Sequence, residues 1–417
     1  MVPDRANSMR CLTVAILALL SVCTTALAQN SFVYAHTRSH ISIPFKMVKS
    51  LVIIPIMVND KGPYNFVLDT GVGMILFTDP SLIDSLNITF KRDIKIKGFG
   101  EGGDLSAYIT GNLKMNVTEY IQGSFSAAFL KDEAFDLSGY TGMPVHGLIG
   151  YEFFNSFTVK INYSGNTLTL YRPDAFYVPK KGFKIPINIE DRKPYLETAV
   201  TLQNGKSILT KLIIDTGAGH PLSLETNEGL PFELPEKHVE ANLGVGLAGP
   251  ITGFVARVKS LKIGKFELNK VTAAFPDYKD VASKLFSINR HGNLGNYVLK
   301  RFDVVFDYKR ECLYLKKGIY FKEPFEHDMS GLELASAGPD LSRIIVSRVE
   351  KSSPGEEVNL KEGDEIVSVN FKPVSELGVE AIANMLQSGN ERSLLLQIIP
   401  KGEKRTKNVI ITLKKRV

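Results

Sequence analysis

The sequence repeats itself over about two thirds of its length, and this repeat limits the possible folds more than any other feature. The segments "FVLDTGVG" at 66–73 and "IIDTGAG" at 213–219 place the same Asp-Thr-Gly tripeptide after an apolar run. A Gly-x-Gly pair follows each tripeptide at the same distance, and "HGLIG" and "HGNLG" follow further along at nearly equal distances. Residues 40–320 are therefore two copies of one unit of about 140 residues.

Each unit is rich in strands. Short apolar or alternating runs such as "FTVKINY" and "TLTLY" are broken by Gly, Asn, Asp and Pro, and helical patterning is limited to "FFNSF" and "YVLKRF". We therefore predict a mainly β fold with two lobes related by a pseudo-twofold axis, lobe 1 at 29–172 and lobe 2 at 173–327. Residues 328–417 alternate strand patterns with the helix-like "SELGVEAIANMLQ", which predicts a separate small α+β domain.

The two aspartates suggest acid–base chemistry. If a pseudo-twofold axis brings equivalent loops together, Asp69 and Asp215 lie side by side and share one proton. One carboxylate can then activate a water while the other protonates the carbonyl oxygen of a peptide bond. The expected loop-support residues are Thr70, Gly71, Thr216 and Gly217, whose hydroxyls tie the facing loops and whose N–H groups point at the carboxylates.

The Gly-x-Gly pairs predict two hairpin tips that close over a substrate. The candidates for these flaps are Gly98, Gly100, Gly244 and Gly246. His146 and His291 also occupy equivalent places in the repeat. No spacing of His, Cys or carboxylate residues supports a metal site, so we expect these histidines to hydrogen-bond their own loops and expect no cofactor.

On these motifs, residues 40–320 resemble the retropepsin-like and pepsin-like aspartic proteases, and in particular bacterial exported forms with both lobes in one chain. The resemblance implies that Asp69 and Asp215 are catalytic, and that the segments 148–150 and 293–295 pack behind them. Asn293 departs from the family's apolar pattern, so the lobes need not be equivalent. Val72 and Ala218 stand where many members carry Ser or Thr, which predicts a less acidic pH optimum; a maximal rate below about pH 3.5 would contradict this.

Residues 328–417 resemble a PDZ domain of the bacterial protease-associated kind, on the segment "SSPGEEVNLKEGDEIVSVN". Val358 and Asn359 depart from the small residue and glycine usual there. The resemblance implies binding of protein C-terminal tails by strand addition, with the terminal carboxylate near Gly331 and Leu332. The alternative is a packing domain without a ligand.

The N-terminus predicts export. Arg5 and Arg10 precede an apolar stretch and a small-residue cleavage site, so residues 1–28 are expected to be a signal peptide for a periplasmic or secreted protein. Lipid anchoring at Cys23 is the less favoured alternative, because Val22 is bulky for the preceding position. Cys312 would then be the single mature cysteine, without an intrachain disulfide.

The net charge of the chain bears on which partners the protein can bind. A net charge of +6 without an aromatic-basic constellation does not indicate nucleic-acid binding. We expect a monomeric aspartic endopeptidase acting on polypeptides, with the PDZ domain binding tails or regulating the site. The alternative is a non-catalytic envelope protein that binds extended peptides on the same fold.

Overall fold

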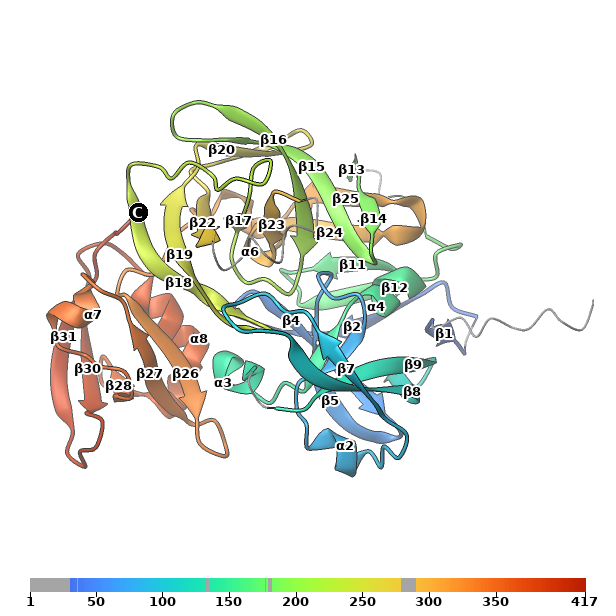
Figure 1. Ribbon diagram of the computed structural model, residues 1–417, viewed down its shortest axis with the longest axis horizontal. Helices are drawn as coiled ribbons and strands as arrows, with labels where there is room; N and C mark the ends of the chain where they lie inside the picture. Colours follow the sequence, from blue (N-terminus) through green and yellow to red (C-terminus); the bar gives the residue numbers. More distant parts are fainter. Residues whose placement is uncertain (1–30, 36, 133–134, 177, 179–181, 279–289) are drawn as a thin grey trace, which may run out of the picture.

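The computed structural model describes residues 31–35, 37–132, 135–176, 178, 182–278 and 290–417. The predicted signal peptide at 1–28, with Cys23, lies outside the described residues. Within the described part of the chain, no helix is long and apolar enough to cross a bilayer. The protein is mainly β, as predicted (Figure 1).

The first repeat forms one large sheet. Its strands are β1 (Val33–Tyr34), β3 (Lys46–Val48), β4 (Leu51–Val58), β5 (Lys61–Leu68), β6 (Ile75–Phe77), β7 (Arg92–Ile96), β8 (Leu105–Thr118), β9 (Ile121–Leu130) and β10 (Gly147–Ile149). Two short helices flank it, α2 (Leu82–Ser85) and α3 (Leu137–Thr141).

The second repeat forms another. Its strands are β14 (Asn188–Glu190), β15 (Lys193–Thr201), β16 (Ser207–Asp215), β17 (Leu222–Leu224), β18 (His238–Gly246), β19 (Gly249–Arg257), β20 (Ser260–Ile263), β21 (Phe266–Asn269), β22 (Thr272–Pro276) and β23 (Gly292–Gly295). The order β22-β17-β23-β16-β15 matches β9-β6-β10-β5-β4 of the first repeat. In both, the strand carrying the Leu-Gly or Ile-Gly segment runs parallel to the strand that leads into Asp-Thr-Gly.

A third sheet joins the two repeats. It contains β2 (His40–Pro44), β11 (Thr158–Asn162), β12 (Thr167–Tyr171), β13 (Phe183–Pro186), β24 (Phe302–Asp307) and β25 (Cys312–Lys317). The repeats meet where β11 pairs with β24. Helices α4 (Tyr151–Ser156) and α6 (Asn296–Leu299) and the 3-10 turns η1 (Tyr308–Arg310) and η2 (Ile319–Lys322) precede or follow its strands.

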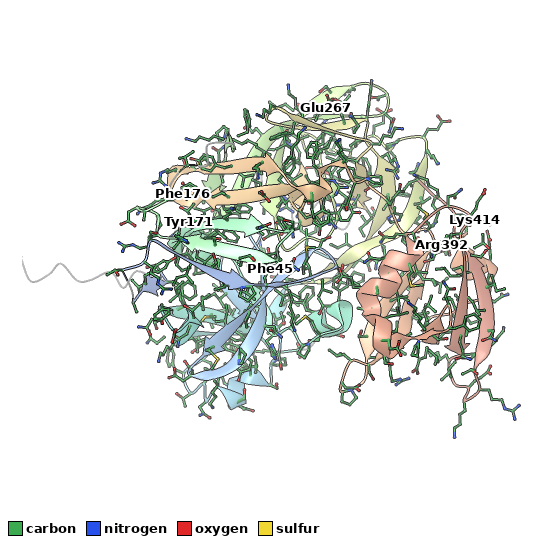
Figure 2. All side chains as sticks on the ribbon, turned by 180° about the vertical axis from the view of Figure 1, so that it is seen from behind. Phe45, Tyr171, Phe176, Glu267, Arg392 and Lys414 are labelled. Atoms are coloured by element: carbon green, nitrogen blue, oxygen red, sulfur yellow. The ribbon has the colours of Figure 1, made fainter. Side chains whose placement is uncertain are left out.

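Aromatic packing covers the joining sheet. Tyr171 and Phe176 lie together with ring centroids 5.2 Å apart (Figure 2). Phe176 packs with Val305, Tyr314 and Cys312, and Cys312 is fully buried on β25. Cys312 therefore packs as a small apolar strand residue. One continuous core then extends through both repeats, so they fold as one body.

The C-terminal region has a separate core. Its strands are β26 (Leu332–Ala337), β27 (Arg343–Val349), β28 (Glu365–Val369), β29 (Lys372–Pro373), β30 (Ser393–Ile399) and β31 (Lys407–Thr412), and its helices are α7 (Pro354–Glu357) and α8 (Val374–Leu386). Ser353 caps α7 through a hydrogen bond from the Glu356 N–H, as the Ser-Pro pair predicts. Inside α8, Gly378 has φ 71° and kinks the predicted helix.

A buried arginine fixes the segment that links the second repeat to this domain. Arg301 is 0% exposed, and its guanidinium donates to the carbonyl oxygens of Tyr297, Glu323 and Pro324 at 3.0–3.1 Å. It also lies 3.7 Å from the centroid of the Phe325 ring. These three hydrogen bonds and the ring contact hold the linker in one conformation, and Nε has no hydrogen-bond partner among the described residues.

Candidate active site

Each aspartate lies at the end of a central, buried strand. β5 ends at Leu68, one residue before Asp69, and β16 ends at Asp215 itself. β10 and β23 run parallel beside them, and the Asp69 N–H donates to the Ile149 carbonyl at 2.8 Å. The apolar runs before each aspartate thus anchor the loops in the core, where Gly71, Asp215 and Gly217 remain partly exposed.

The threonines tie the two loops to each other. The Thr70 N–H donates to Thr216 Oγ1 at 3.0 Å, and the Thr216 N–H donates to Thr70 Oγ1 at 2.9 Å. The Thr70 hydroxyl donates to the Ile214 carbonyl at 2.6 Å, and the Thr216 hydroxyl to the Leu68 carbonyl at 2.7 Å. Both side chains are fully buried, so this symmetric set holds the loops face to face.

The two carboxylates are packed close together against the glycines. A Cβ at Gly71 would lie 2.9 Å from Asp215 Oδ2 and 3.0 Å from Asp69 Oδ1, and one at Gly217 would lie 2.2 Å from Asp69 Cγ. These positions therefore admit only glycine. The Gly71 N–H donates to Asp69 Oδ1 at 2.7 Å and the Gly217 N–H to Asp215 Oδ1 at 2.9 Å. The structure thus brings the six predicted loop residues together.

Asp69 is strongly perturbed. Its side chain is buried, and this burial, followed by the neighbouring Asp215 charge, raises the pKa of Asp69 well above its usual range. The Gly71 N–H and the Lys193 charge lower the pKa by less. A pair of carboxylates in which one keeps its proton while the other is ionised can act as acid and base together.

The second loop has a donor that the first lacks. Asn293 Nδ2 donates to Asp215 Oδ2 at 2.6 Å. Asn293, on β23, pairs with Ile213 on β16. The equivalent residue of the first repeat is Leu148, which pairs with Val67. The predicted inequivalence of the lobes therefore takes a definite chemical form at Asp215.

Buried charges near the aspartates were missed by the sequence analysis. Arg290 forms a bidentate ion pair with Glu225 at 2.8 and 3.0 Å, and their side chains are 8% and 3% exposed. The Arg290 guanidinium also lies 5.1 Å from the centroid of the Phe99 ring. Lys193, half-buried, interacts with both aspartates and with Arg290. Glu225 and Arg290 are 65 residues apart, and no local pattern relates them.

The two predicted flaps contact each other at their tips. Gly98 and Gly100 lie in the connection from β7 to β8, and Gly244 and Gly246 at the end of β18. The Gly102 N–H donates to the Ala248 carbonyl at 2.7 Å, and the Ala248 N–H donates to the Phe99 carbonyl at 2.9 Å. The two tips are therefore joined by backbone hydrogen bonds.

Each histidine side chain hydrogen-bonds the backbone of the strand that leads into an aspartate. His146 Nδ1 accepts from the Asn65 N–H at 3.0 Å, and His291 Nδ1 accepts from the Lys211 N–H at 3.1 Å. These partners are themselves equivalent in the repeat, but they lie on the strands β5 and β16 and not in the histidines' own loops, so the predicted partner was wrong. Among the described residues, no three His, Cys, Asp or Glu side chains gather in a group that could hold a metal ion.

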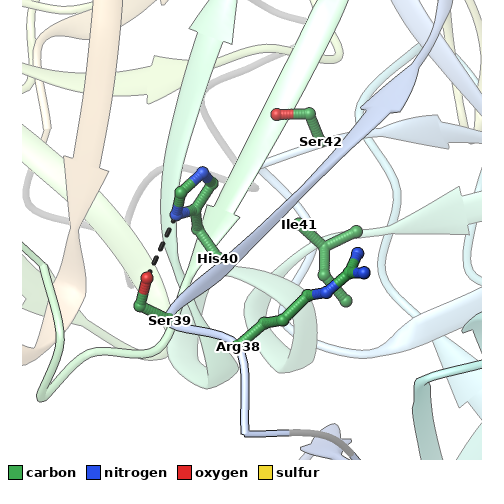
Figure 3. Close-up of a pocket in the computed structure, with 5 residues that line it drawn as sticks. All are labelled: Arg38, Ser39, His40, Ile41 and Ser42. Carbon is green, nitrogen blue, oxygen red and sulfur yellow. Dashed lines mark hydrogen bonds between the residues drawn. The ribbon is translucent and has the colours of Figure 1, made fainter.

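A pocket lies elsewhere on the molecule. Its lining residues are Arg38, Ser39, His40, Ile41 and Ser42 (Figure 3). Ser39 Oγ lies 3.2 Å from His40 Nδ1. None of the predicted site residues lines this pocket.

In the predicted carboxylate-binding loop of the C-terminal domain, backbone N–H groups donate hydrogen bonds to side chains of the same loop. Gly331 has φ 72°, and its N–H donates to Asp328 Oδ1 at 2.5 Å. The Leu332 N–H donates to Ser330 Oγ at 3.1 Å. Burial raises the pKa of Asp328 to about 6. These N–H groups are thus already occupied by the chain's own side chains.

The comparisons with known proteins identify the C-terminal domain. A family model described as "PDZ domain" matches residues 321–399, so the chain contains a PDZ domain. No curated protein matches the chain. One similar solved structure is a photosystem II D1 C-terminal processing protease, at 22% identity and a TM-score of 0.20, covering 22% of this chain and 24% of that protein.

Proposed function

We propose that this protein is an aspartic endopeptidase in which Asp69 and Asp215 share a proton and hydrolyse peptide bonds. The observation that supports this most is the cross-tied pair of loops, which sets two carboxylates against each other with the pKa of Asp69 raised. Two carboxylates in contact destabilise a fold unless they share a proton. The arrangement therefore does not serve stability, which favours a catalytic role.

The reaction needs only these groups and a water. The ionised carboxylate takes a proton from a water, the water oxygen attacks the carbonyl carbon, and the protonated carboxylate donates to the carbonyl oxygen, which gives a gem-diol. The carboxyl group that took the water proton then donates it to the peptide nitrogen, the carbon–nitrogen bond breaks, and one gem-diol hydroxyl returns its proton to the other carboxylate, so that the pair again holds one proton. No covalent intermediate with the protein forms. The flap tips, joined through Gly102 and Ala248, must part to admit an extended chain and can then exclude bulk water.

The PDZ domain would bind peptides or protein C-terminal tails and regulate this site or supply it with substrate. The apolar stretch near the N-terminus supports export to the periplasm or beyond.

The test is cleavage of a mixed peptide pool by the purified protein from about pH 3.5 to about pH 8, read by mass spectrometry. We expect defined cuts that disappear in Asp215→Asn, with a maximal rate above about pH 3.5. Asp303→Asn, at a half-buried carboxylate that pairs with Lys316 on the neighbouring strand, is the matched control and should cut normally.

Other outcomes decide against the proposal. A folded protein that makes no cuts at any pH would favour the non-catalytic peptide-binding alternative. Cuts that persist in Asp215→Asn would assign the activity to other residues.

A further inference from the structure

We propose that Asn293 is a positioning residue that keeps Asp215 as the ionised, water-activating member of the pair and leaves the shared proton on Asp69. This inference rests on the proposed function and adds roles for the two aspartates that their matching tripeptides do not distinguish.

The hydrogen bonds differ between the two carboxylates. Asp215 accepts at both oxygens, from the Gly217 N–H at Oδ1 and from Asn293 Nδ2 at Oδ2. For Asp69, the described residues give a backbone donor at Oδ1, and Leu148 replaces the asparagine. A donor held against a carboxylate stabilises the ionised form. Val72 and Ala218 carry no hydroxyl that could restore the balance.

Asn293 presents its amide nitrogen for a clear reason. The opposite orientation would set its oxygen against a carboxylate oxygen, two acceptors in contact. Asn293 is 8% exposed, and its side chain lies beside that of His220. His220 follows Asp215 on the same loop, at the place that Met74 has in the first repeat.

The other charged groups around the pair do not supply the same asymmetry. Lys193 interacts with both aspartates. Glu225 and Arg290 both interact with Asp215, but their charges are opposite and they pair with each other through two hydrogen bonds. Burial lowers the pKa of His220, and burial raises the pKa of Tyr308, so both are neutral near pH 7. Asn293 is therefore the direct side-chain donor that distinguishes the carboxylates.

The experiment is the pH dependence of kcat/KM for Asn293→Leu, which installs the first repeat's residue. We expect the acid limb to move up by about one pH unit, a loss of about tenfold on that limb, while the basic limb stays in place. Asn293→Ser, which restores a donor, should recover much of the shift. Ser223→Ala is the control: it removes a buried hydroxyl from β17 at the position that pairs with Asn293, and it should not move either limb.

Two results would overturn the inference. An unchanged profile in folded Asn293→Leu would mean that the amide does not set the ionised partner. Movement of the basic limb alone would put the proton on Asp215. Failure of the unmodified protein to cut any peptide is a different result, because it rejects the proposed function itself and the inference with it.

A separate set of contacts concerns the PDZ domain. We infer that the chain's own Lys49–Ser50 turn and helix α3 cover the tail-binding edge of this domain, and that a bound tail must displace them. β26 is the outer strand of the PDZ sheet and packs with α8, and PDZ domains add a peptide strand at such an edge.

Lys49 hydrogen-bonds to both elements that border this edge, β26 and α8. Lys49 Nζ donates to the Leu334 carbonyl on β26 at 3.2 Å, and the Lys49 N–H donates to Glu380 Oε1 on α8 at 3.2 Å. Helix α3 lies against the same two elements (Figure 1), since a Cβ at Gly142 would come 2.8 Å from Val379 Cγ1 and 2.9 Å from Ser336 Oγ. A peptide strand added to β26 would need the Leu334 carbonyl that Lys49 occupies.

The same turn touches the Asp215 loop. A Cβ at Gly219 would lie 2.7 Å from the Lys49 carbonyl oxygen. Asn296 donates from its side chain to the Ser50 carbonyl and from its N–H to the Ala218 carbonyl, the latter at 2.7 Å. Displacing the turn would therefore disturb the loop that carries Asp215, and by linkage the two sites affect each other.

The test is binding of a pool of fluorescent peptides with free carboxylates and Val or Leu at the C-terminus. We expect Lys49→Ala in the full chain to bind about fivefold more tightly than the unmodified protein, and Lys46→Ala, exposed on the neighbouring β3, to bind unchanged. Glu380→Ala, which removes the contact on α8, should also bind more tightly. Equal or weaker binding by both Lys49→Ala and Glu380→Ala would overturn the inference.

Discussion

Asp69→Asn should abolish peptide hydrolysis and at the same time raise the stability of the protein at pH 7. Loss of the shared proton removes the group that protonates the carbonyl oxygen, so we expect kcat to fall by about 10³-fold or more. The measurement is the initial rate of cleavage at the optimum of the unmodified protein, with the melting temperature recorded beside it.

The sign of the stability change follows from the raised pKa of Asp69. Burial and the Asp215 charge raise that pKa in the folded state, so the folded protein binds the proton more tightly than the unfolded chain does. Between the ordinary pKa of an aspartate and the raised folded value, stability is lost as pH rises. An asparagine does not titrate, so the variant escapes this loss and its melting temperature at pH 7 should increase by a few degrees. Near pH 3 the difference should vanish.

The control is Asp60→Asn, at a carboxylate that is 68% exposed and paired with Lys114. It should leave both rate and melting temperature unchanged. An Asp69→Asn variant that melts below the unmodified protein at pH 7 would contradict the raised pKa. One that still cuts would contradict the assignment of Asp69 as the acid.

The strands that support the site could be predicted because their signal is local. Apolar alternation and punctuation by Gly, Asn and Pro located β11 and β12, and the equal spacing of the glycines revealed the repeat. The two helix-like patterns predicted longer or more regular helices than the structure has. Gly378, at φ 71°, interrupts α8, and "YVLKRF" yields only the single turn of α6 before β24 begins at Phe302.

The polar surroundings of the site could not be predicted, because they depend on how distant segments face each other. Asn293 was visible only as a departure from an apolar pattern, and its contact with Asp215 needs the register of β23 on β16. The Lys49 contact with Leu334 joins residues 285 positions apart. No period of 2.0 or 3.6 encodes such pairs, since they form only after both copies of the repeat and the PDZ domain have packed.

The hydroxyl of Thr216 should contribute more to stability than that of another threonine buried equally deeply. Thr216→Val keeps the shape of the side chain but leaves the Thr70 N–H and the Leu68 carbonyl without their partner. Two buried groups left unsatisfied cost about 2–5 kcal/mol together, and we expect the melting temperature to fall by about 5–15 °C. Cleavage should fall with it, because the loops are no longer tied.

Thr158→Val is the matched control for this loss. Thr158 is 1% exposed, and its Oγ1 has no hydrogen-bond partner among the described residues. Replacing that hydroxyl with a methyl group removes a desolvated polar atom and breaks no hydrogen bond, so this variant should melt at or above the temperature of the unmodified protein. Equal melting temperatures for the two variants would mean that the cross-tie does not hold the loops together. A large loss in Thr216→Val alone would show that the contact between Asp69 and Asp215 depends on hydrogen bonds behind them, because the two carboxylates repel one another whenever the shared proton is absent.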